Sequence, residues 1–252
     1  MKSVLYLIIG AIIFTSCSNN NSSQLSKETN NMETIKVITE KDKIYVTALI
    51  YIKEGQQSKF EEYRAKAGAI LERHNARIEK VIKPTMLAQG DMPLPDEIQF
   101  VVFDSKESMD AVNNDTDYKK IIEELRIPSI EKLIVISSKL SDFEFTREIG
   151  DKSKAYGIAL LNYNEGEKYE KLFEDYHNQV CEIMPEFGTH FERFLIPTGI
   201  KGDFKQPDEI HRFYFDSMDG LQQMGSDPRM LKLFQLRDES LSDLNFIIGE
   251  AL

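Results

Sequence analysis

The sequence contains two tandem copies of one structural unit. The motif G-D-x3-P-D-E-I occurs at residues 90–98 and again at residues 202–210, an offset of 112. At the same offset, Phe-Asp-Ser at 103–105 matches Phe-Asp-Ser at 215–217. Further pairs keep the offset between 111 and 113, namely Tyr45 with Tyr156, Phe60 with Phe173, Asp115 with Asp227, and Leu125-Arg126 with Leu236-Arg237. A repeat of this length indicates a tandem duplication of a unit of about 95 residues, so the fold must be one that two such units can build together.

Each unit shows the same order of elements. It opens with a strand that is apolar on both faces, continues with a helix whose apolar residues are spaced by three or four, and then has two strands around the G-D-x3-P-D-E-I segment. The Gly and Pro of that segment favour a turn, so the two strands are expected to form a hairpin. A short helix, a second helix that begins at Asp115 or Asp227, and a last strand complete the unit. The opening strands are expected at 43–53 and 155–163, the last strands at 131–137 and 245–249, and Pro128 is expected to end a helix after Arg126.

The order βαββαβ predicts a ferredoxin-like unit, in which the helices cover one face of the sheet and the other face still needs a partner. Two units in one chain can supply that partner to each other. We therefore predict an α+β protein with two tandem ferredoxin-like repeats, at residues 33–140 and 153–252 with a linker at 141–152, packed sheet to sheet as a dimeric α+β barrel within one chain. Such a pseudo-dimer is compatible with a monomeric protein.

These motifs resemble those of α+β barrel domains of unknown function that are related to the antibiotic-biosynthesis-monooxygenase superfamily. The shared features are a Tyr in the first strand, Phe-x-x-Tyr on the first helix, a Gly after the second strand, Phe-x-Ser after the third, and Leu-Arg at the end of the last helix. The resemblance covers almost all of residues 43–250. It implies the barrel fold and leaves the activity open, because the superfamily includes oxygenases, cyclases, haem enzymes and proteins with no known activity.

The first residues have the features of an export signal. Lys2 is followed by eleven uncharged residues, 4–14, a length that suits the core of a signal peptide but is too short for a membrane span of about 20 residues. The run ends in Phe-Thr-Ser-Cys at 14–17, which resembles the lipobox of bacterial lipoproteins, with Phe where the family usually has Leu. The resemblance implies a signal peptide at 1–16 and lipidation of Cys17. An ordinary secretory signal with a chance cysteine is the alternative.

The composition after the leader favours a lipid anchor over a charged contact with the membrane. Residues 17–32 are rich in Ser and Asn, which predicts a flexible tether behind the lipidated cysteine. Without residues 1–16 the chain has 30 basic and 42 acidic residues, so anionic lipid and nucleic acid both repel it. We expect binding to membrane lipid through Cys17, no nucleic-acid partner, and a location in the cell envelope, at the outer membrane of a Gram-negative bacterium.

The repeat also identifies candidate ligand-binding residues. Arg126 and Arg237 recur in the last turn of a helix, where a cation meets the negative end of the helix dipole. The same guanidinium groups are suited to holding an anionic ligand at the mouth of a barrel. Tyr45 and Tyr156 open equivalent strands, and their rings either line a cavity between the sheets or complete a core.

The candidates for catalysis lie in the second unit alone. His190 and His211 are expected on neighbouring strands, with Arg212 and Tyr214 close by in sequence, and barrel closure could bring these four residues together. Haem-binding relatives use a barrel histidine, so the resemblance keeps a haem site as an alternative. His74 continues the apolar stripe of a helix, so we expect a packed, hydrogen-bonded side chain there.

No metal or cofactor is predicted. The histidines lack the spacing of a metal-binding motif, and two cysteines are too few for a cysteine-rich metal site. Cys181 lies between apolar residues of a predicted helix, so we expect a buried thiol rather than a nucleophile. The repeated Asp-Glu pairs at 96–97 and 208–209 lie beside a turn and are expected to be solvated.

Two hypotheses for the function follow. The first is a membrane-anchored lipoprotein with a non-catalytic module that binds a small molecule or an envelope protein. The second is a cofactor-independent oxygenase, cyclase or isomerase with its site in the second unit, or a haem-binding barrel. An enzyme needs polar groups that converge on a cavity, so the contents of the barrel distinguish the two.

Overall fold

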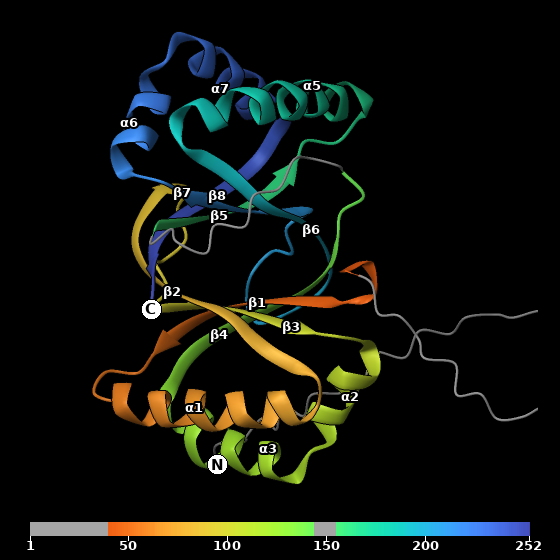
Figure 1. The fold of residues 1–252 in the computed structure, drawn as a ribbon, viewed down its shortest axis with the longest axis vertical. Helices are drawn as coiled ribbons and strands as arrows, with labels where there is room; N and C mark the ends of the chain where they lie inside the picture. The colour runs from red at the N-terminus through yellow and green to blue at the C-terminus, as the bar shows by residue number, and fades with distance from the viewer. Residues whose placement is uncertain (1–39, 144–154) are drawn as a thin grey trace, which may run out of the picture.

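The computed structural model describes residues 40–143 and 155–252, which form two halves with the same order of elements (Figure 1). The predicted leader and tether, and most of the predicted linker, lie outside the described residues. The first half consists of η1 (Glu40–Asp42), β1 (Ile44–Ile52), α1 (Gln57–Arg73), β2 (Ala76–Gln89), β3 (Glu97–Phe103), α2 (Lys106–Asn114), α3 (Thr116–Ile121), η2 (Ile122–Arg126), α4 (Ile127–Ser129) and β4 (Ile130–Leu140). The second half consists of β5 (Ala155–Tyr163), α5 (Glu167–Ile183), η3 (Met184–Phe187), β6 (Thr189–Lys201), β7 (Glu209–Phe215), α6 (Met218–Ser226), α7 (Pro228–Ser240) and β8 (Leu241–Ala251). Within the described ranges, no helix has the length and apolar character that a membrane span requires.

The eight strands form one closed antiparallel barrel, which confirms the predicted dimeric α+β barrel. Each half contributes four neighbouring strands, in the orders β4-β1-β3-β2 and β8-β5-β7-β6, which is the strand order of a ferredoxin-like unit. The halves meet at two equivalent seams, where β2 pairs with β8 and β4 pairs with β6. The two sheets are thus joined edge to edge, and closure leaves no edge among the described strands.

The second strand of each half is long because it serves both sheets. Residues 76–82 of β2 pair with β3, and residues 82–89 pair with β8 of the other half. Strand β6 makes the same change, from β7 to β4. Strand β4 is also longer than its apolar pattern predicted, and its additional residues 138–140 pair with β6 across the seam. Pairing with the other half at the seams therefore extends these strands beyond the length that their own sequence pattern predicts.

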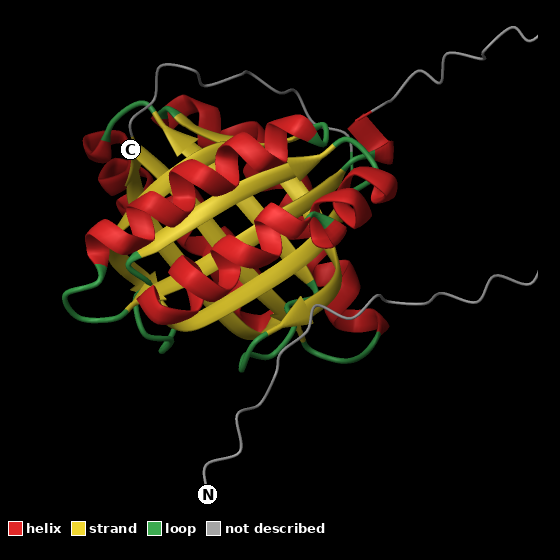
Figure 2. Cartoon of the chain, turned by 90° about the horizontal axis from the view of Figure 1, so that it is seen from below, coloured by secondary structure: helices red, strands yellow, loops and turns green. Residues whose placement is uncertain are grey.

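The helices lie outside the barrel, in one layer over each half (Figures 1 and 2). The predicted apolar stripes face inward: α1 buries Phe60 and Tyr63, and α5 buries the equivalent Phe173 and Tyr176. The barrel interior is consequently sealed from the sides by two sheets, and only its two ends can admit a ligand.

The repeated Ser and Asp residues are helix N-caps. The hydroxyls of Ser105 and Ser217 accept hydrogen bonds from backbone N–H groups at the start of α2 and α6. The carboxylates of Asp115 and Asp227 do the same for α3 and α7. Such a cap stabilises a helix by about 1 kcal/mol, which gives these repeated positions a structural role.

The helix of the first half does not end after Arg126, as Pro128 led us to expect, because α4 continues the helical path through that proline. The preceding η2 is a wide π-type turn. The hydroxyl of Ser129 donates to the backbone carbonyls of Leu125 and Arg126. Ser240 makes the equivalent bond to the carbonyl of Arg237 at the end of α7, so in both halves a serine hydroxyl satisfies a carbonyl of the last helical turn.

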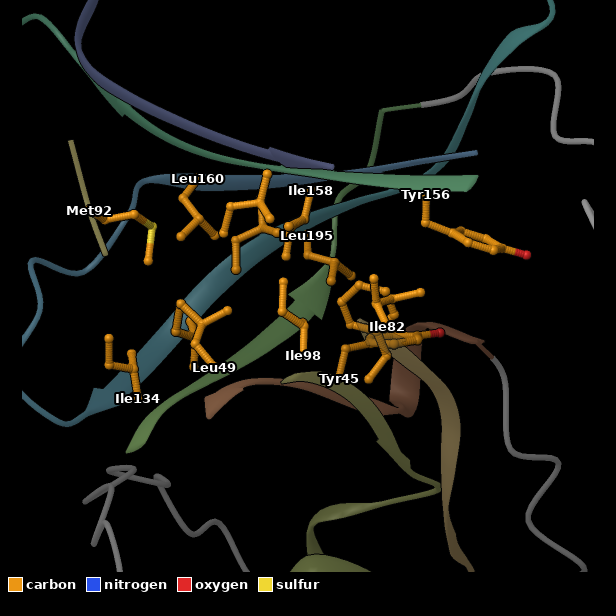
Figure 3. Close-up of a cluster of buried hydrophobic side chains, with 14 of the residues drawn as sticks. Tyr45, Leu49, Ile82, Met92, Ile98, Ile134, Tyr156, Ile158, Leu160 and Leu195 are labelled. Atoms are coloured by element: carbon orange, nitrogen blue, oxygen red, sulfur yellow. The ribbon is translucent and has the colours of Figure 1, made fainter. Parts of the chain in front are cut away.

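The middle of the barrel is filled with apolar side chains from both halves. Figure 3 shows these side chains meeting between the sheets, with the hydroxyls of Tyr45 and Tyr156 directed toward the same end. Leu49, Ile98 and Ile134 are fully buried there. A void of this interior, lined mainly by isoleucine and aromatic side chains, has no room for a water molecule. A packed, mainly apolar core therefore occupies the middle of the barrel, with Thr47 as a buried polar residue in it, and the charged groups lie beyond this core.

Candidate functional site

One end of the barrel interior is charged, and two equivalent β-bulges create it. In β2 the bulge sets Glu79 and Lys80 against one residue of β3. In β6 the bulge sets Glu192 and Arg193 against Arg212 of β7. A bulge places two successive residues opposite one, so the usual alternation of side chains is interrupted and both members of each pair reach the interior. We call this region the charged end, and its residues are Glu40, Lys43, Glu79, Lys80, Glu192, Arg193 and Arg212.

The two halves exchange equivalent cation–aromatic contacts at the charged end. The ammonium group of Lys80 lies 3.5 Å from the ring centre of Tyr156. The guanidinium group of Arg193 lies 4.7 Å from the ring centre of Tyr45. In each pair the cation and the ring belong to different halves. These contacts therefore link the two repeats, and they place both predicted tyrosines beside a cation.

Arg212 lies where the two halves meet. The corresponding position of the first unit is Phe100, and the Arg212 guanidinium lies 3.8 Å from the centre of that ring. Arg212 donates a hydrogen bond to Glu79 at 2.9 Å and forms an ion pair with Glu192 at 2.6 Å. Because Arg212 is only 1% exposed, a single buried cation joins the equivalent glutamates of both repeats.

The other charges at this end are also paired. Arg193 donates to Glu79 at 2.6 Å and to Glu40 at 3.2 Å, and Lys80 donates to Glu192 at 3.3 Å. Burial alone would raise the pKa of Glu192, but the neighbouring guanidinium and ammonium groups lower it overall. Glu192 therefore stays ionised at neutral pH, and its ion pairs with Arg212 and Lys80 stay charged.

Three buried donors of this network make no hydrogen bond with the described residues, and one of them, Nη2 of Arg212, still forms the ion pair with Glu192. The Nε atoms of Arg193 and Arg212 are buried and make no hydrogen bond with the described residues. Arg193 is 4% exposed, so bulk water does not readily supply the missing acceptor. A buried N–H without an acceptor carries a desolvation cost of about 1–3 kcal/mol. The charged end consequently has capacity for a further acceptor group.

Strand register divides the four predicted catalytic residues between two faces of the sheet. Tyr214 is buried in the interior, and the His190 ring stacks on it with ring centres 4.8 Å apart. Arg212 faces the same interior, next to the charged end. His211 lies on the opposite face of β7, beneath α5. Since adjacent residues of a strand point to opposite faces, His211 and Arg212 do not share one site.

His211 belongs to a buried polar cluster between β7 and α5. Its Nε2 lies 3.2 Å from Nε2 of His177 and 3.5 Å from a carboxylate oxygen of Glu209. The hydroxyl of Tyr163 donates to the same carboxylate. Burial first, and then the charge of His211, lower the pKa of His177 to about 3, so His177 is neutral at physiological pH.

The first half has a different cluster at the same place. It contains Arg64, Glu97 and Gln99, and both Arg64 and Gln99 donate to the glutamate. A pair of histidines is therefore not required by the fold, and it is specific to the second half. Glu97 and Glu209 are 2% and 6% exposed, so the prediction that the repeated Asp-Glu pairs are solvated is wrong for both glutamates.

The histidines, as arranged, do not fit a metal ion or a haem. The rings of His177 and His211 are stacked, with centres 4.6 Å apart and planes at 23°, so their Nε2 atoms cannot both direct lone pairs at one ion. Aromatic rings enclose His177, which leaves no open side for a haem. His74 and His190 each contact an aspartate through Nε2. No group of three His, Cys, Asp or Glu within residues 40–143 and 155–252 is placed to hold a metal ion.

The predicted arginines and Cys181 lie in the helix layers, away from the charged end. Arg237 donates to Gln89 at 2.9 Å, and Arg126 interacts with the hydroxyl of Tyr118. Cys181 packs with apolar side chains of the second half, and burial, with a smaller effect of a nearby carboxylate, raises the pKa of its thiol to about 12. Its thiolate, the nucleophilic form, is therefore scarce at neutral pH.

An open hollow of about 350 Å³ lies outside the barrel, between α1 and α3. Its lining includes Lys66, which pairs with Glu62, and Arg73, which pairs with Asp117. These charges are exposed and already have partners, so the hollow offers a ligand less than the charged end does.

Most residues of the charged end were not among the predicted candidates, although a signal for them exists. Ile78-Glu79-Lys80 and Phe191-Glu192-Arg193 show the pattern apolar-Glu-cation at an offset of 113. An acid and a cation side by side on a predicted strand look like one inward and one outward residue. The bulge is what directs both the acid and the cation of each pair inward, and the local sequence pattern does not predict a bulge.

Comparison with solved structures supports the fold and nothing finer. An anthrone oxidase-like protein matches with a TM-score of 0.55 at 10% identity, over 84% of this chain and 92% of that chain. A chlorite dismutase variant from Candidatus Nitrospira defluvii matches with a TM-score of 0.54 at 9% identity, over 85% and 92%. A protein of Fusobacterium nucleatum proposed to be a monooxygenase matches with a TM-score of 0.53 at 8% identity, over 83% and 92%. No protein-family model and no curated protein sequence matches the chain. The chain is thus a dimeric α+β barrel of the kind found in monooxygenase-like proteins and chlorite dismutases.

Proposed function

We propose that this chain is a lipid-anchored protein of the cell envelope, and that its barrel is a non-catalytic module that binds a small polar molecule at the charged end. The observation behind the binding site is the pair of buried guanidinium Nε donors without acceptors. The side chains of Glu79 and Lys80 are both 18% exposed, so a ligand can reach this end from solvent. The packed core next to it leaves no space for a substrate inside the barrel.

The anchor rests on the lipobox-like sequence that ends at Cys17. We expect the wild-type protein, produced in a Gram-negative host, to enter the membrane fraction and to incorporate a labelled fatty acid. The Cys17→Ala variant should lose both properties, because the thiol that receives the lipid is gone. Cys181→Ala is the matched control and should behave as the wild type. A Cys17→Ala protein that still sediments with membranes would contradict the lipid anchor.

Binding at the charged end is tested by thermal unfolding of the purified protein with small anionic, cationic and neutral polar compounds. We expect anionic compounds to raise the unfolding temperature, because they supply acceptors to the arginine donors. Arg193→Met should remove this effect. Arg229→Met, which changes an arginine with a 50% exposed side chain, should leave it intact. If no compound acts, or if Arg193→Met responds like the wild type, the proposed binding site is wrong.

Catalysis is the alternative, and the histidine cluster of the second half is the observation that favours it. Buried titratable groups with shifted pKa values occur often at active sites, and here the pKa of His177 is lowered to about 3. Structures of similar fold include proteins named for oxidase or monooxygenase activity. The test is whether the protein consumes a compound of the same screen. If His211→Gln loses this activity and Arg193→Met retains it, the protein is an enzyme and the proposal of a non-catalytic binding module is wrong.

A further inference from the structure

A carboxylate of the chain itself occupies the charged end. Glu40, in the turn before β1, accepts hydrogen bonds from Lys43 at 2.6 Å, from the hydroxyl of Tyr45 at 2.7 Å and from Arg193 at 3.2 Å. Burial opposes ionisation, but the bonds from Lys43 and Tyr45 and the charge of Arg193 lower the pKa of Glu40 to about 2. Three converging donors, two of them cationic, make a strong receptor for a carboxylate group.

The two sides of this contact differ in how firmly the fold holds them. The Arg193 side chain is 5% exposed and Tyr45 is 1% exposed, and both project from barrel strands into the packed interior. The Glu40 side chain is 47% exposed and belongs to a three-residue turn without a buried residue. The donors are therefore preorganised, whereas the carboxylate they hold can leave without uncovering the core.

Charge balance favours an anion as the replacement. The charged end has four cations, Lys43, Lys80, Arg193 and Arg212, and three carboxylates, Glu40, Glu79 and Glu192. Without Glu40 its net charge rises from one positive to two positive. The buried Nε of Arg193 also remains available as a donor. A small carboxylate would restore both the charge and the hydrogen bonds that the departing side chain had supplied.

We infer that the charged end is a binding site for small carboxylates and that Glu40 is its built-in occupant, which an external carboxylate must displace. This inference rests on the proposed function. It adds that the ligands are small carboxylates and that Glu40 lowers the affinity of the site for them. The contact is autoinhibitory: the site binds external acids weakly while Glu40 occupies it, and strongly once that side chain is removed.

The test uses the purified full-length protein and acetate as the probe, with sodium chloride at equal ionic strength as the reference. In Glu40→Ala the missing carboxylate leaves space for acetate. We expect this variant to bind acetate at least about tenfold more tightly than the wild type in calorimetric titration, and to gain thermal stability from acetate but not from chloride. Glu40→Gln, which keeps the shape of the side chain, should fall between the two.

Glu62→Ala is the matched control, because Glu62 is similarly exposed and pairs with a lysine, but lies on α1 outside the charged end. It should bind acetate as the wild type does. The double variant Glu40→Ala, Arg193→Met should lose the gain. If wild type and Glu40→Ala bind acetate with equal affinity, Glu40 does not compete with external carboxylates and this inference is wrong. The proposed binding function would still stand if compounds of the screen stabilise the protein. Absence of binding by every variant to every compound of the screen would remove the proposed function as well.

Discussion

Replacing Arg212 with methionine is expected to lower the free energy of unfolding by about 3 kcal/mol, measured by urea denaturation. Among the described residues, the Arg212 guanidinium is the one cation that pairs with both Glu79 and Glu192, at 2.9 and 2.6 Å, and Arg212 is 1% exposed. Its removal leaves two carboxylates in a poorly solvated place. Arg193 and Lys80 still contact these carboxylates, so the loss should lie at the low end of the range of about 3–5 kcal/mol for breaking a buried pair.

Two further variants separate charge from packing. Arg229 also contacts two carboxylates, Glu186 and Asp227, but its side chain is 50% exposed, so Arg229→Met should change the free energy of unfolding by at most about 1 kcal/mol. The double variant Glu192→Gln, Arg212→Met should recover part of the loss, because it removes one carboxylate together with the cation and keeps the net charge of the charged end at one positive. A destabilisation by Arg212→Met no larger than that by Arg229→Met would show that the two halves do not depend on this cation.

The repeat predicted the fold because it contains information about long-range pairing that local patterns lack. Two units with the order βαββαβ have two unsatisfied sheet faces and four sheet edges, and one closed barrel satisfies all of them. The seams were less predictable. The residues of β2 beyond Ile82 pair with β8, and the end of β4 pairs with β6, so these strand ends are stabilised by partners from the other half rather than by their own sequence pattern.

The candidate site was predictable only where simple strand alternation holds. Tyr45 and Tyr156 were identified by the repeat, and they line the charged end. Grouping His211 with Arg212 disregarded alternation, which sends adjacent side chains to opposite faces. Glu79 and Glu192 were missed for the opposite reason, because a bulge breaks alternation at those two points. Predicting the charged end required knowing that both second strands carry an extra residue at the same position.

Replacing Gly202 with alanine is expected to destabilise the protein by about 2–4 kcal/mol, because two costs combine. Gly202 follows β6 and has φ of +110°, a conformation that costs a residue with a side chain about 1–3 kcal/mol. A Cβ atom would also lie 2.4 Å from the backbone carbonyl oxygen of Leu133 on β4, across the seam. The equivalent Gly90, with φ of +102°, meets β8 in the same way, 2.8 Å from the carbonyl oxygen of Leu244. The repeated glycine thus permits the close approach of the two halves.

Two other glycines separate strain from contact in the same unfolding experiment. Gly55 has φ of +73° but no atom within 4 Å of an added Cβ, so Gly55→Ala should show the conformational cost alone, about 1 kcal/mol. Gly225, in α6, has open space and no such strain, so Gly225→Ala should stabilise the protein by up to about 1 kcal/mol. The order of stability should therefore be Gly225→Ala, wild type, Gly55→Ala and Gly202→Ala. Amide hydrogen exchange should also increase along β4 and β6 in Gly202→Ala alone, since only this substitution pushes the seam apart. A Gly202→Ala protein as stable as Gly55→Ala would mean that the seam yields to a methyl group, and that the glycine serves the turn rather than the junction of the halves.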